Sequence, residues 1–495
     1  MAAVPNRGWC RWPTADRPRP GGKILEVSST AENYDIVVIG GGPGGYAAAL
    51  YGASAGLNIA LVEKAKLGGT CLHVGCIPAK ELLETASVVR HVAGAKEFGV
   101  DVGPPALDLT VTQARKQRII DNLTKGLAGL LKGRKVTVYD GVGILRGDRQ
   151  VNVSGGESGS VDLTADQVIL AAGSVPRTLP GFDVDGRIVM SSDELLAIDQ
   201  LPAKTVVIGG GAIGLEFASM LADLGSQVTV LEAADKILPG CDADVAKLIE
   251  RAFKKRGITI RTGVAVSGHS PGGTGTTVSF GDGETLDTGV VVVSIGRRPF
   301  ADLLDLSGTG VVVDERGFVI VDQFGLTAAP GVYAVGDITN TPQLAHIGFA
   351  EGMLAIKHLL GEEPLPIDYQ TVPWCIYTHP EIAYAGHSEG SAREAGFDIV
   401  VSKHRFMGNG RAMIVGETDG MVKVVAERQP DGTGGRILGV HMVGPWVTEQ
   451  LGQGYMAVNW EATVDEVAAF IQPHPTMSEL FGESALALTG RSLHG

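Results

Sequence analysis

The sequence has 495 residues, of which 44% are apolar and 19% charged, a composition typical of a folded protein and not of a disordered chain. Because a single core stops growing near about 300 residues, we expect about three domains. Forty-one basic and 55 acidic residues give a net charge of −14, which argues against a nucleic-acid partner. Five unevenly spaced cysteines are too few for a secreted disulfide scaffold, so a reducing, cytoplasmic compartment is expected.

The N-terminal region divides into two parts of different character. Residues 1–33 carry several prolines and scattered arginines without an apolar period, which predicts a mobile tail. Residues 36–62 contain no charged side chain and are long enough for a membrane helix. Their GGGPGG segment would break such a helix, however, so we predict a strand, a turn and a helix, and no membrane span.

One pattern occurs twice in the chain, 169 positions apart. Each copy has an apolar β-branched run, a G-x-G-x-x-G turn, an alanine-rich helical segment and a second apolar run followed by a glutamate. The turn glycines and the glutamate are Gly40, Gly42, Gly45 and Glu63 in the first copy, and Gly209, Gly211, Gly214 and Glu232 in the second. This pattern predicts two doubly wound α/β units, whereas the last 130 residues mix strand-like and helical runs and predict an α+β domain.

Each element of the repeated pattern has a physical role in dinucleotide binding. The first glycine permits a tight turn, the second lets the backbone approach a pyrophosphate, and the third lets the helix pack closely on the strand. The helix N-terminus then offers amide donors to the phosphates. Glycine turns alone are common, but here both copies also have the strand, the helix and the acid. A carboxylate at Glu232 accepts a ribose 2′-hydroxyl and repels a 2′-phosphate, so the second site is expected to prefer NAD over NADP.

Cys71 and Cys76 follow the first repeat in the segment GGTCLHVGCIPAK. A zinc site would need a second close pair, whereas Cys10, Cys241 and Cys375 are isolated in the sequence, and no metal is expected. Two buried thiols that act as small apolar side chains are another interpretation. A redox-active disulfide is the third, and a helix that starts near Cys76 would favour a thiolate there through its dipole.

A disulfide between these cysteines places a demand on the local backbone. Positions five apart in a regular helix are separated by about 8 to 9 Å between Cα atoms, which exceeds the roughly 7 Å that a disulfide can bridge. The chain must therefore be distorted between them, and Gly75 can supply the distortion. Because a dithiol gives up electrons and a nicotinamide accepts a hydride, a flavin is expected between them: FAD in the first nucleotide fold and NAD in the second.

Together these segments resemble one enzyme family. The dithiol segment, the two glycine turns, AAGSVP (171–176), IGRRP (295–299), YAVGDIT (333–339) and HPTMSE (474–479) are similar to the FAD-dependent pyridine nucleotide-disulfide oxidoreductases. YTHPEIAYAG (377–386) is more similar to the dihydrolipoamide dehydrogenase branch than to glutathione or mercuric reductases. Gln472 and Ala79 depart from that branch, where histidine and serine are frequent, but neither removes a proposed acid, base or nucleophile.

The resemblance implies a role for particular residues. Cys71 would be the thiol that meets substrate and Cys76 the thiol beside the flavin, while His474 would be the base, reaching in from the other subunit and oriented by Glu479. Thr476 and Glu479 also have the T-x-x-E spacing of a helix capping box, which is the competing interpretation of that glutamate. Other positions are carried over as an ion pair near the flavin (Lys80 and Glu216), the ribityl-binding acid (Asp337) and further cofactor contacts (Gly173, Gly296 and Ala345). We assign no chemistry to Arg297 and Arg298.

The resemblance also implies a domain plan. It consists of the tail at 1–33, an FAD-binding part at 34–180, an NAD-binding domain at 181–299, a second FAD and central part at 300–366, and a dimerisation domain at 367–495. The expected activity is oxidation of protein-bound dihydrolipoamide by a homodimer. The expected partner is the lipoyl domain of a dihydrolipoamide acyltransferase or the glycine cleavage H protein. The alternatives are a reductase of another small disulfide or a metal ion, and a non-catalytic flavoprotein subunit.

Overall fold

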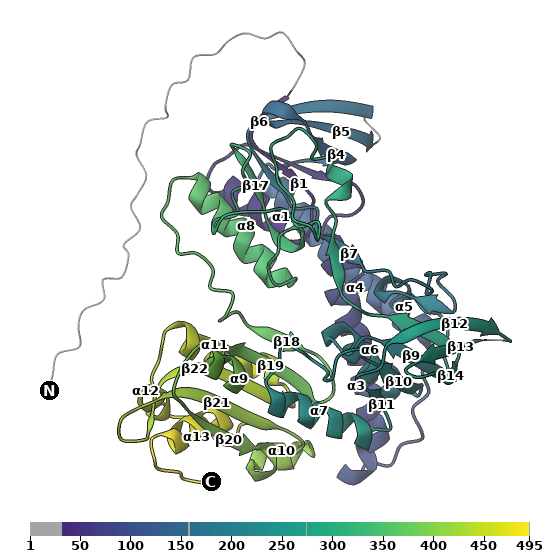
Figure 1. The fold of residues 1–495 in the computed structure, drawn as a ribbon, viewed down its shortest axis with the longest axis vertical. Coiled ribbons are helices and arrows are strands. Elements are labelled where there is room, and N and C mark those ends of the chain that lie inside the picture. The colour runs from purple at the N-terminus through teal and green to yellow at the C-terminus, as the bar shows by residue number, and fades with distance from the viewer. Residues whose placement is uncertain (1–31, 157–158, 274, 495) are drawn as a thin grey trace.

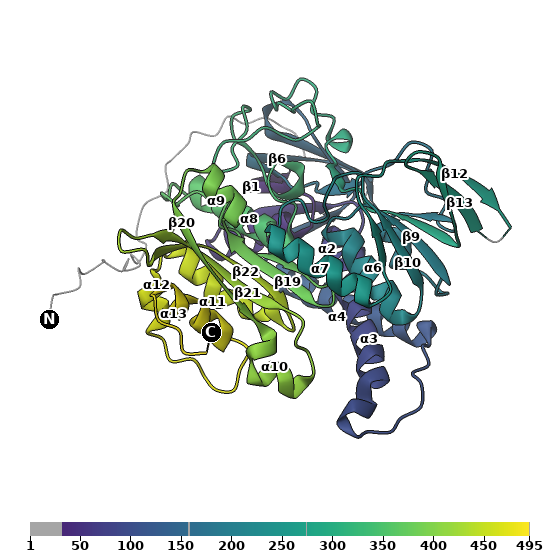
Figure 2. The ribbon, with the colours of Figure 1, turned by 60° about the horizontal axis from the view of Figure 1, so that its bottom comes forward.

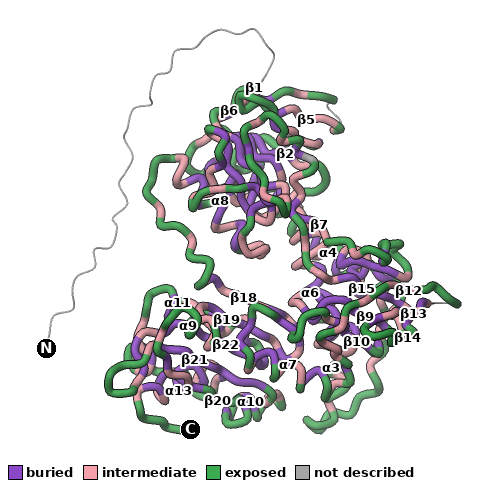
Figure 3. Tube along the Cα trace, in the orientation of Figure 1, coloured by how far each residue is buried: buried purple, intermediate pink, exposed green. Residues whose placement is uncertain are grey.

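The computed structural model describes residues 32–156, 159–273 and 275–494. The tail predicted for residues 1–33 lies outside them, except for its last two residues, which begin the first strand. The three largest sheets, with their helices, form three parts of the molecule (Figures 1 and 2). In Figure 3 the buried residues lie within these sheets and on the faces of the helices that cover them. Within the described ranges, every helix is too short or too polar to cross a bilayer.

The first sheet contains the first copy of the repeat. Its strands are β1 (Glu32–Ile39), β2 (Ile59–Glu63), β3 (Thr137–Asp140), β4 (Val142–Leu145), β5 (Gln150–Gly156), β6 (Gly159–Leu170) and β17 (Val332–Ala334). They are arranged in the order β3-β2-β1-β6-β5-β4, with β17 paired in parallel to β6. Because side chains alternate along a strand, Ile36 and Val38 pack on one face, where the helices α1 (Pro43–Ser54), α4 (Leu109–Gly133) and α8 (Ala345–Leu359) lie. Val37 and Ile39 pack on the opposite face.

The second sheet contains the second copy and is parallel throughout. It comprises β8 (Val189–Met190), β9 (Lys204–Ile208), β10 (Gln227–Leu231), β11 (Thr259–Arg261) and β15 (Val290–Val293), in the order β11-β10-β9-β15-β8. The adjoining helices are α5 (Ser192–Leu195), α6 (Ala212–Leu224) and α7 (Ala243–Lys255). The other face is covered by an antiparallel sheet of β12 (Val266–Gly272), β13 (Gly275–Phe280) and β14 (Glu284–Thr288). A ribbon of β7 (Ser174–Pro176) and β16 (Arg297–Pro299) joins this unit to the first.

The C-terminal sheet is antiparallel and belongs to the α+β domain that the sequence predicted. It comprises β18 (Trp374–Ile376), β19 (Glu381–Gly386), β20 (Ile399–Arg405), β21 (Met421–Arg428) and β22 (Gly434–Gly444), in the order β18-β19-β22-β21-β20. Its helices are α9 (Glu389–Glu394), α10 (Gly410–Val415), α11 (Val447–Asn459), α12 (Val464–Ala468) and α13 (Glu479–Leu488). Helices α11 to α13 pack on one face, and α7 of the second unit lies against the other (Figure 2).

A buried ionic cluster joins the second unit to the C-terminal sheet. The side chain of Lys423 on β21 is only 1% exposed, and its Nζ donates to both carboxylate oxygens of Asp242, at 2.8 and 2.9 Å. It also donates to Asp244 at 2.7 Å and to Glu389 at 2.9 Å. Asp242 caps the N-terminus of α7 by accepting from the amide of Asp244. One buried ammonium group therefore holds three carboxylates from two different parts of the fold.

The Lys423 cluster should contribute strongly to stability. Replacing Lys423 with methionine leaves the buried Asp242 without a cation and removes one of the two cations that Asp244 and Glu389 each contact. We therefore expect a loss of about 3 to 5 kcal/mol in the free energy of unfolding. Urea denaturation measures this loss. The matched control is Lys403→Met, since Lys403 pairs with Asp244 at 2.7 Å but its side chain is 45% exposed, and we expect almost no change. Equal losses in the two variants would contradict the cluster's role.

The same cluster predicts how stability depends on pH. Burial alone would raise the pKa of Asp244, but hydrogen bonds from Lys403 and Lys423 outweigh it and lower that pKa to about 2. A carboxyl group whose pKa is lower in the folded state stabilises the fold above its ordinary pKa, and this contribution is lost as the pH falls toward the lowered value. Acid titration of the wild type should therefore show a loss of stability below about pH 4. Lys423→Met should instead gain stability as the pH falls from neutral toward about 4, because Asp242 is buried without its cation and becomes neutral.

Candidate active site

The two glycine turns have the same construction at the carboxyl edge of their sheets. Gly40 and Gly209 adopt positive φ angles of +110° and +113°, and a Cβ at either would collide with a backbone carbonyl of the neighbouring strand. A Cβ at Gly45 or Gly214 would collide with the carbonyl oxygen of the first glycine of its own turn. These four glycines are therefore required by the turn and by the contact between helix and strand.

The middle glycine of each turn faces open space. A Cβ at Gly211 would have no heavy atom within 4 Å, and one at Gly42 would meet only the Cα of Gly69, at 4.0 Å. Both residues are the N-caps of their helices, α1 and α6, and no side chain caps either helix. Free amide donors and an open approach are the features that a bound pyrophosphate needs. The residues of both turns therefore fit a dinucleotide.

The two glutamates are held in the same way. Glu63 accepts from the amides of Gly41 at 2.7 Å and Ala65 at 2.8 Å. Glu232 accepts from Gly210 at 2.5 Å and Ala234 at 2.7 Å. Each carboxylate thus ties its glycine turn to the end of the second strand, a structural task beyond the ribose contact that the sequence suggested. Each oxygen has a further lone pair with which it can accept a ribose hydroxyl.

Further predicted cofactor contacts lie along the same sheet edges. Gly173 follows β6 and Gly296 follows β15, both with positive φ, and a Cβ at either would have no heavy atom closer than 4.0 Å. Ala345 is the first residue of α8. Gly348 in the same helix packs closely against the backbone of Gly44 in α1: a Cβ at Gly348 would lie 3.3 Å from the Gly44 nitrogen. The first turns of α1 and α8 therefore lie together, and both direct their positive dipole ends to this edge.

Asp337 belongs to a chain of hydrogen bonds that the sequence did not reveal. Ser174 donates to its Oδ2 at 2.5 Å, and Arg297 donates to the hydroxyl of Ser174 at 2.7 Å and to its carbonyl at 2.8 Å. Burial raises the pKa of Asp337, while Ser174 and Arg297 act against that rise. Arg297, to which the sequence assigns no chemistry, therefore supports this acid. Its neighbour Arg298 forms an exposed ion pair with Asp302.

The dithiol lies at a break between two helices. Helix α2 (Gly69–His73) contains Cys71, and Cys76 is the first residue of α3 (Cys76–Gly94). Gly75 forms the break, as predicted, and its φ of −145° lies outside the left-handed region. A Cβ there would lie 2.9 Å from the carbonyl oxygen of Thr70 and 3.3 Å from the Cα of Cys71. Only glycine lets the two helices approach so closely.

The two thiols have opposite acidities. Both are free thiols in the structure. The hydrogen bond from Cys71, helped by the positive charge of Lys80, lowers the pKa of Cys76 to about 7 against the effect of burial. Hydrogen bonding to Cys76 and burial together raise the pKa of Cys71. Near neutral pH the pair therefore holds one thiolate at the start of α3, where the helix dipole also favours it.

Lys80 and Glu216 form a close pair beside the dithiol. The Lys80 Nζ lies 2.9 Å from Oε1 and 2.8 Å from Oε2 of Glu216. Burial opposes the charge on Lys80, but Glu216 outweighs it and raises the pKa of this lysine. The alternative of two ordinary surface charges is wrong for Glu216, which is buried in α6. Tyr46 on α1 is a neighbour that the sequence did not indicate: burial, and then both thiols, raise its pKa to about 12.

His474 and Glu479 form a second pair on the C-terminal domain. The Nδ1 of His474 lies 2.8 Å from Oε1 of Glu479, whose Oε2 accepts from the amide of Thr476 at 2.7 Å. The capping-box interpretation is wrong, because α13 begins at Glu479 itself and the Thr476 hydroxyl donates to Pro473. The side chain of His474 is 78% exposed, and within the described part of one chain it has no hydrogen bond to either cysteine.

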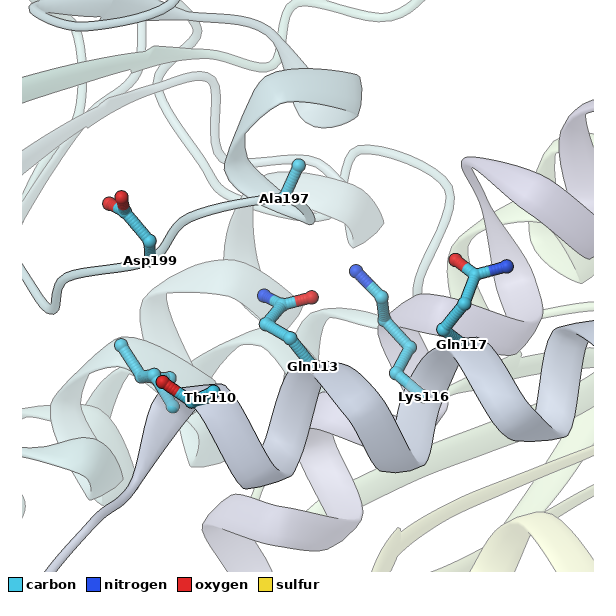
Figure 4. A pocket seen from close by; sticks show the side chains of 7 residues that line it. Thr110, Gln113, Lys116, Gln117, Ala197 and Asp199 are labelled. Carbon is cyan, nitrogen blue, oxygen red and sulfur yellow. The ribbon is translucent and has the colours of Figure 1, made fainter.

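A separate cavity of about 470 Å³ lies between the start of α4 and residues 197–199 (Figure 4). None of the predicted site residues lines it. Gln113 donates to the carbonyl oxygen of Ile198 at 2.9 Å, and Lys116 donates to that of Leu196. These polar side chains therefore attach α4 to the segment after α5, which is a structural role.

Comparisons with known proteins cover nearly the whole described chain. The family described as pyridine nucleotide-disulphide oxidoreductase matches residues 34–352, and the dimerisation domain of that family matches residues 372–485. Dihydrolipoyl dehydrogenase of Bacillus subtilis (strain 168) is 43% identical over 477 residues, covering 94% of this chain and 100% of that protein. Dihydrolipoyl dehydrogenase of Thermus scotoductus is 40% identical over 469 residues, covering 94% and 99%.

Solved structures are similar over the same extent. LpdA from Mycobacterium tuberculosis matches with a TM-score of 0.86 and 27% identity, covering 92% of this chain and 100% of that chain. The HOCl-induced flavoprotein disulfide reductase RclA from Escherichia coli matches with a TM-score of 0.81 and 28% identity, covering 92% and 99%. The α/β architecture expected from the sequence, two nucleotide-binding units followed by an α+β domain, is therefore confirmed.

Proposed function

The chain belongs to the pyridine nucleotide-disulfide oxidoreductase family, and on that basis we propose that it oxidises protein-bound dihydrolipoamide to lipoamide through Cys71 and Cys76. It is an FAD-dependent, NAD-linked enzyme of the dihydrolipoyl dehydrogenase type. The observation that carries the proposed path is the placement of the dithiol. A thiolate of lowered pKa starts α3, next to Lys80 and Glu216, in the chain segment that follows the first copy of the repeat.

The proposed exchange of electrons balances at the sulfur atoms. A thiolate of dihydrolipoamide attacks the sulfur of Cys71 in the oxidised enzyme, the Cys71–Cys76 bond breaks, and Cys76 leaves as a thiolate. The second substrate thiol then displaces Cys71, which releases lipoamide and leaves a dithiol with two more electrons. Bound FAD supplies the chemistry that accepts this electron pair from sulfur and delivers it as a hydride to NAD⁺. The hydrogen bond from Cys71 and the charge of Lys80 keep Cys76 ionised, which is the form that can donate electrons.

His474 is proposed as the base for the substrate thiols. Glu479 fixes its Nδ1, so Nε2 is the nitrogen that faces a reacting thiol and takes its proton. Since this pair is exposed on one chain, we propose that it reaches the cysteines of a second copy in a homodimer. The mostly exposed apolar side chains of Trp460, Phe470 and Ile471, the last of them 98% exposed, belong to the same domain and support a covered surface there.

The proposed partner is a lipoyl domain, either of a dihydrolipoamide acyltransferase or of a glycine cleavage H protein. A steady-state assay tests the proposal. Dihydrolipoamide and NAD⁺ should yield NADH with catalytic turnover, and a reduced lipoyl domain should also act as a substrate in place of free dihydrolipoamide. Efficient reduction of another small disulfide with NADPH, together with no NADH from dihydrolipoamide, would favour the alternative reductase. No turnover with either would favour a non-catalytic flavoprotein.

The choice of nicotinamide gives a further prediction. Replacing Glu232 with alanine removes a charged acceptor for the ribose and a repulsive charge for a 2′-phosphate. We expect kcat/KM for NAD⁺ to fall about 10- to 100-fold, which corresponds to one hydrogen bond to a charged group, while the ratio of NADP⁺ to NAD⁺ use rises. Glu63→Ala is the matched control in the first copy: it should weaken FAD retention and leave that ratio unchanged. A ratio that changes only in the control would contradict the assignment of the two sites.

A further inference from the structure

The turn between β18 and β19 docks on the helix that carries Glu216. The amide of Tyr377 donates to Oε1 of Glu216 at 2.8 Å, and the amide of His379 donates to the hydroxyl of Ser219 at 2.9 Å. Glu216 and Ser219 are three positions apart on α6 and so share one face of that helix. The backbone of the C-terminal domain is thereby attached to the carboxylate that also binds Lys80.

Tyr377 contacts the lysine as well as the carboxylate. The Lys80 Nζ lies 4.8 Å from the centroid of the Tyr377 ring, within the range of a cation–π interaction. The same Nζ donates to both oxygens of Glu216. Tyr377 therefore holds both members of the pair, the carboxylate through its amide and the ammonium through its ring.

The turn is itself held rigidly. Arg256, the C-cap residue that follows α7, donates to the carbonyl of His379 at 2.6 Å and to the hydroxyl of Ser219 at 2.9 Å. It also donates to Asp223 at 2.6 Å, and Asp223 accepts from Arg90 at 2.7 Å. Arg90 lies on α3, the helix that begins with Cys76. A closed ring of contacts thus links the dithiol helix, α6, α7 and the turn.

We propose that Tyr377 is a positioning residue for the redox dithiol, which holds the Lys80–Glu216 pair so that the ammonium group stays directed toward Cys76. This inference deepens the proposed function and rests on it. The charged or titratable groups that face the Cys76 thiol are Cys71 on α2, Lys80 on its own helix, Glu216 on α6 and Tyr46 on α1. Of these, Lys80 is the cation, so its position sets how strongly the thiolate is favoured.

The test is the pH titration of the Cys76 thiolate in the reduced holoenzyme. The long-wavelength absorption of a thiolate in contact with an oxidised flavin measures the fraction of Cys76 that is ionised. The pH dependence of iodoacetamide labelling measures the same fraction without relying on flavin absorption, and peptide fragmentation distinguishes Cys76 from Cys71. Tyr377→Leu should raise the apparent pKa, giving about three- to tenfold less thiolate at pH 6. Tyr377→Phe keeps the ring and the amide and should titrate like the wild type.

Two further variants make the result decisive. Lys80→Met should raise the apparent pKa and so shows that the titration detects the lysine. Ser219→Ala removes the hydroxyl that accepts from the His379 amide and leaves the Tyr377 ring in place. It should also raise the apparent pKa of Cys76, and it replaces Tyr377→Leu as the test if that variant does not fold. The proposal would be overturned if Lys80→Met shifts the pKa of Cys76 but Tyr377→Leu titrates like the wild type. If Tyr377→Leu does not fold, the same outcome in Ser219→Ala would overturn it. A shift in a chain that does not oxidise dihydrolipoamide would contradict the proposed function and leave the positioning role standing.

Discussion

Replacing Cys76 with serine is expected to abolish both the oxidation of dihydrolipoamide and the long-wavelength absorption of a thiolate beside the flavin. A serine hydroxyl cannot form the disulfide and is not ionised near neutral pH, so turnover should fall by at least about three orders of magnitude. Cys71→Ser should lose turnover to the same extent but keep the absorption, because Cys76 remains as a thiolate and a hydroxyl at position 71 can still donate to it. Absorption spectra of the two variants, combined with NADH formation, distinguish the two roles.

The matched control for these variants is the same substitution at another cysteine. Cys375 is half-buried on β18, and burial raises the pKa of its thiol to about 11, so it stays neutral at the working pH. Cys375→Ser should therefore retain activity and spectrum. Absorption that survives in Cys76→Ser, or disappears in Cys71→Ser, would contradict the assignment of the thiolate to Cys76.

The local features of the site could be predicted because each is encoded in a short segment. The glycines at 40, 42 and 45, with their counterparts in the second copy, are required by a turn that the sequence itself contains. The distortion at Gly75 follows from the geometry of a disulfide across five positions. Close contacts of the glycine backbone explain both the turns and the distortion at Gly75. The pattern that indicates them lies within a short segment of the sequence.

The remaining features depend on contacts that the sequence does not mark. Lys423 meets Asp242 across 181 positions, and Tyr377 meets Glu216 across 161. Arg297 reaches Ser174 only because β16 pairs with β7. A single charged or aromatic residue has no periodicity, so its partner follows from the packing of whole domains. The capping box is incomplete for a related reason: Glu479 accepts from the Thr476 amide, but the Thr476 hydroxyl donates to Pro473 and does not cap α13.

Replacing His474 with glutamine should lower kcat/KM for dihydrolipoamide by about 10²- to 10⁴-fold, the usual contribution of a general base. Glutamine cannot take the proton of a substrate thiol. Reduction of ferricyanide by NADH needs no deprotonation of a substrate thiol, so it should be unchanged and serves as the control for folding and cofactor binding.

Mixed dimers decide whether His474 acts on its own chain or on a second copy. In a dimer of one His474→Gln chain and one Cys76→Ser chain, a base supplied from the other subunit leaves one site with both cysteines and an intact histidine. Random mixing makes about half of the dimers mixed, each with one of two sites intact, so two inactive proteins should together regain about a quarter of the wild-type activity. A base that acts within its own chain leaves every site defective, and the mixture would stay inactive. We therefore expect activity to recover after the two proteins are unfolded and refolded together. Within the described part of one chain, the exposed His474–Glu479 pair has no hydrogen bond to a thiol.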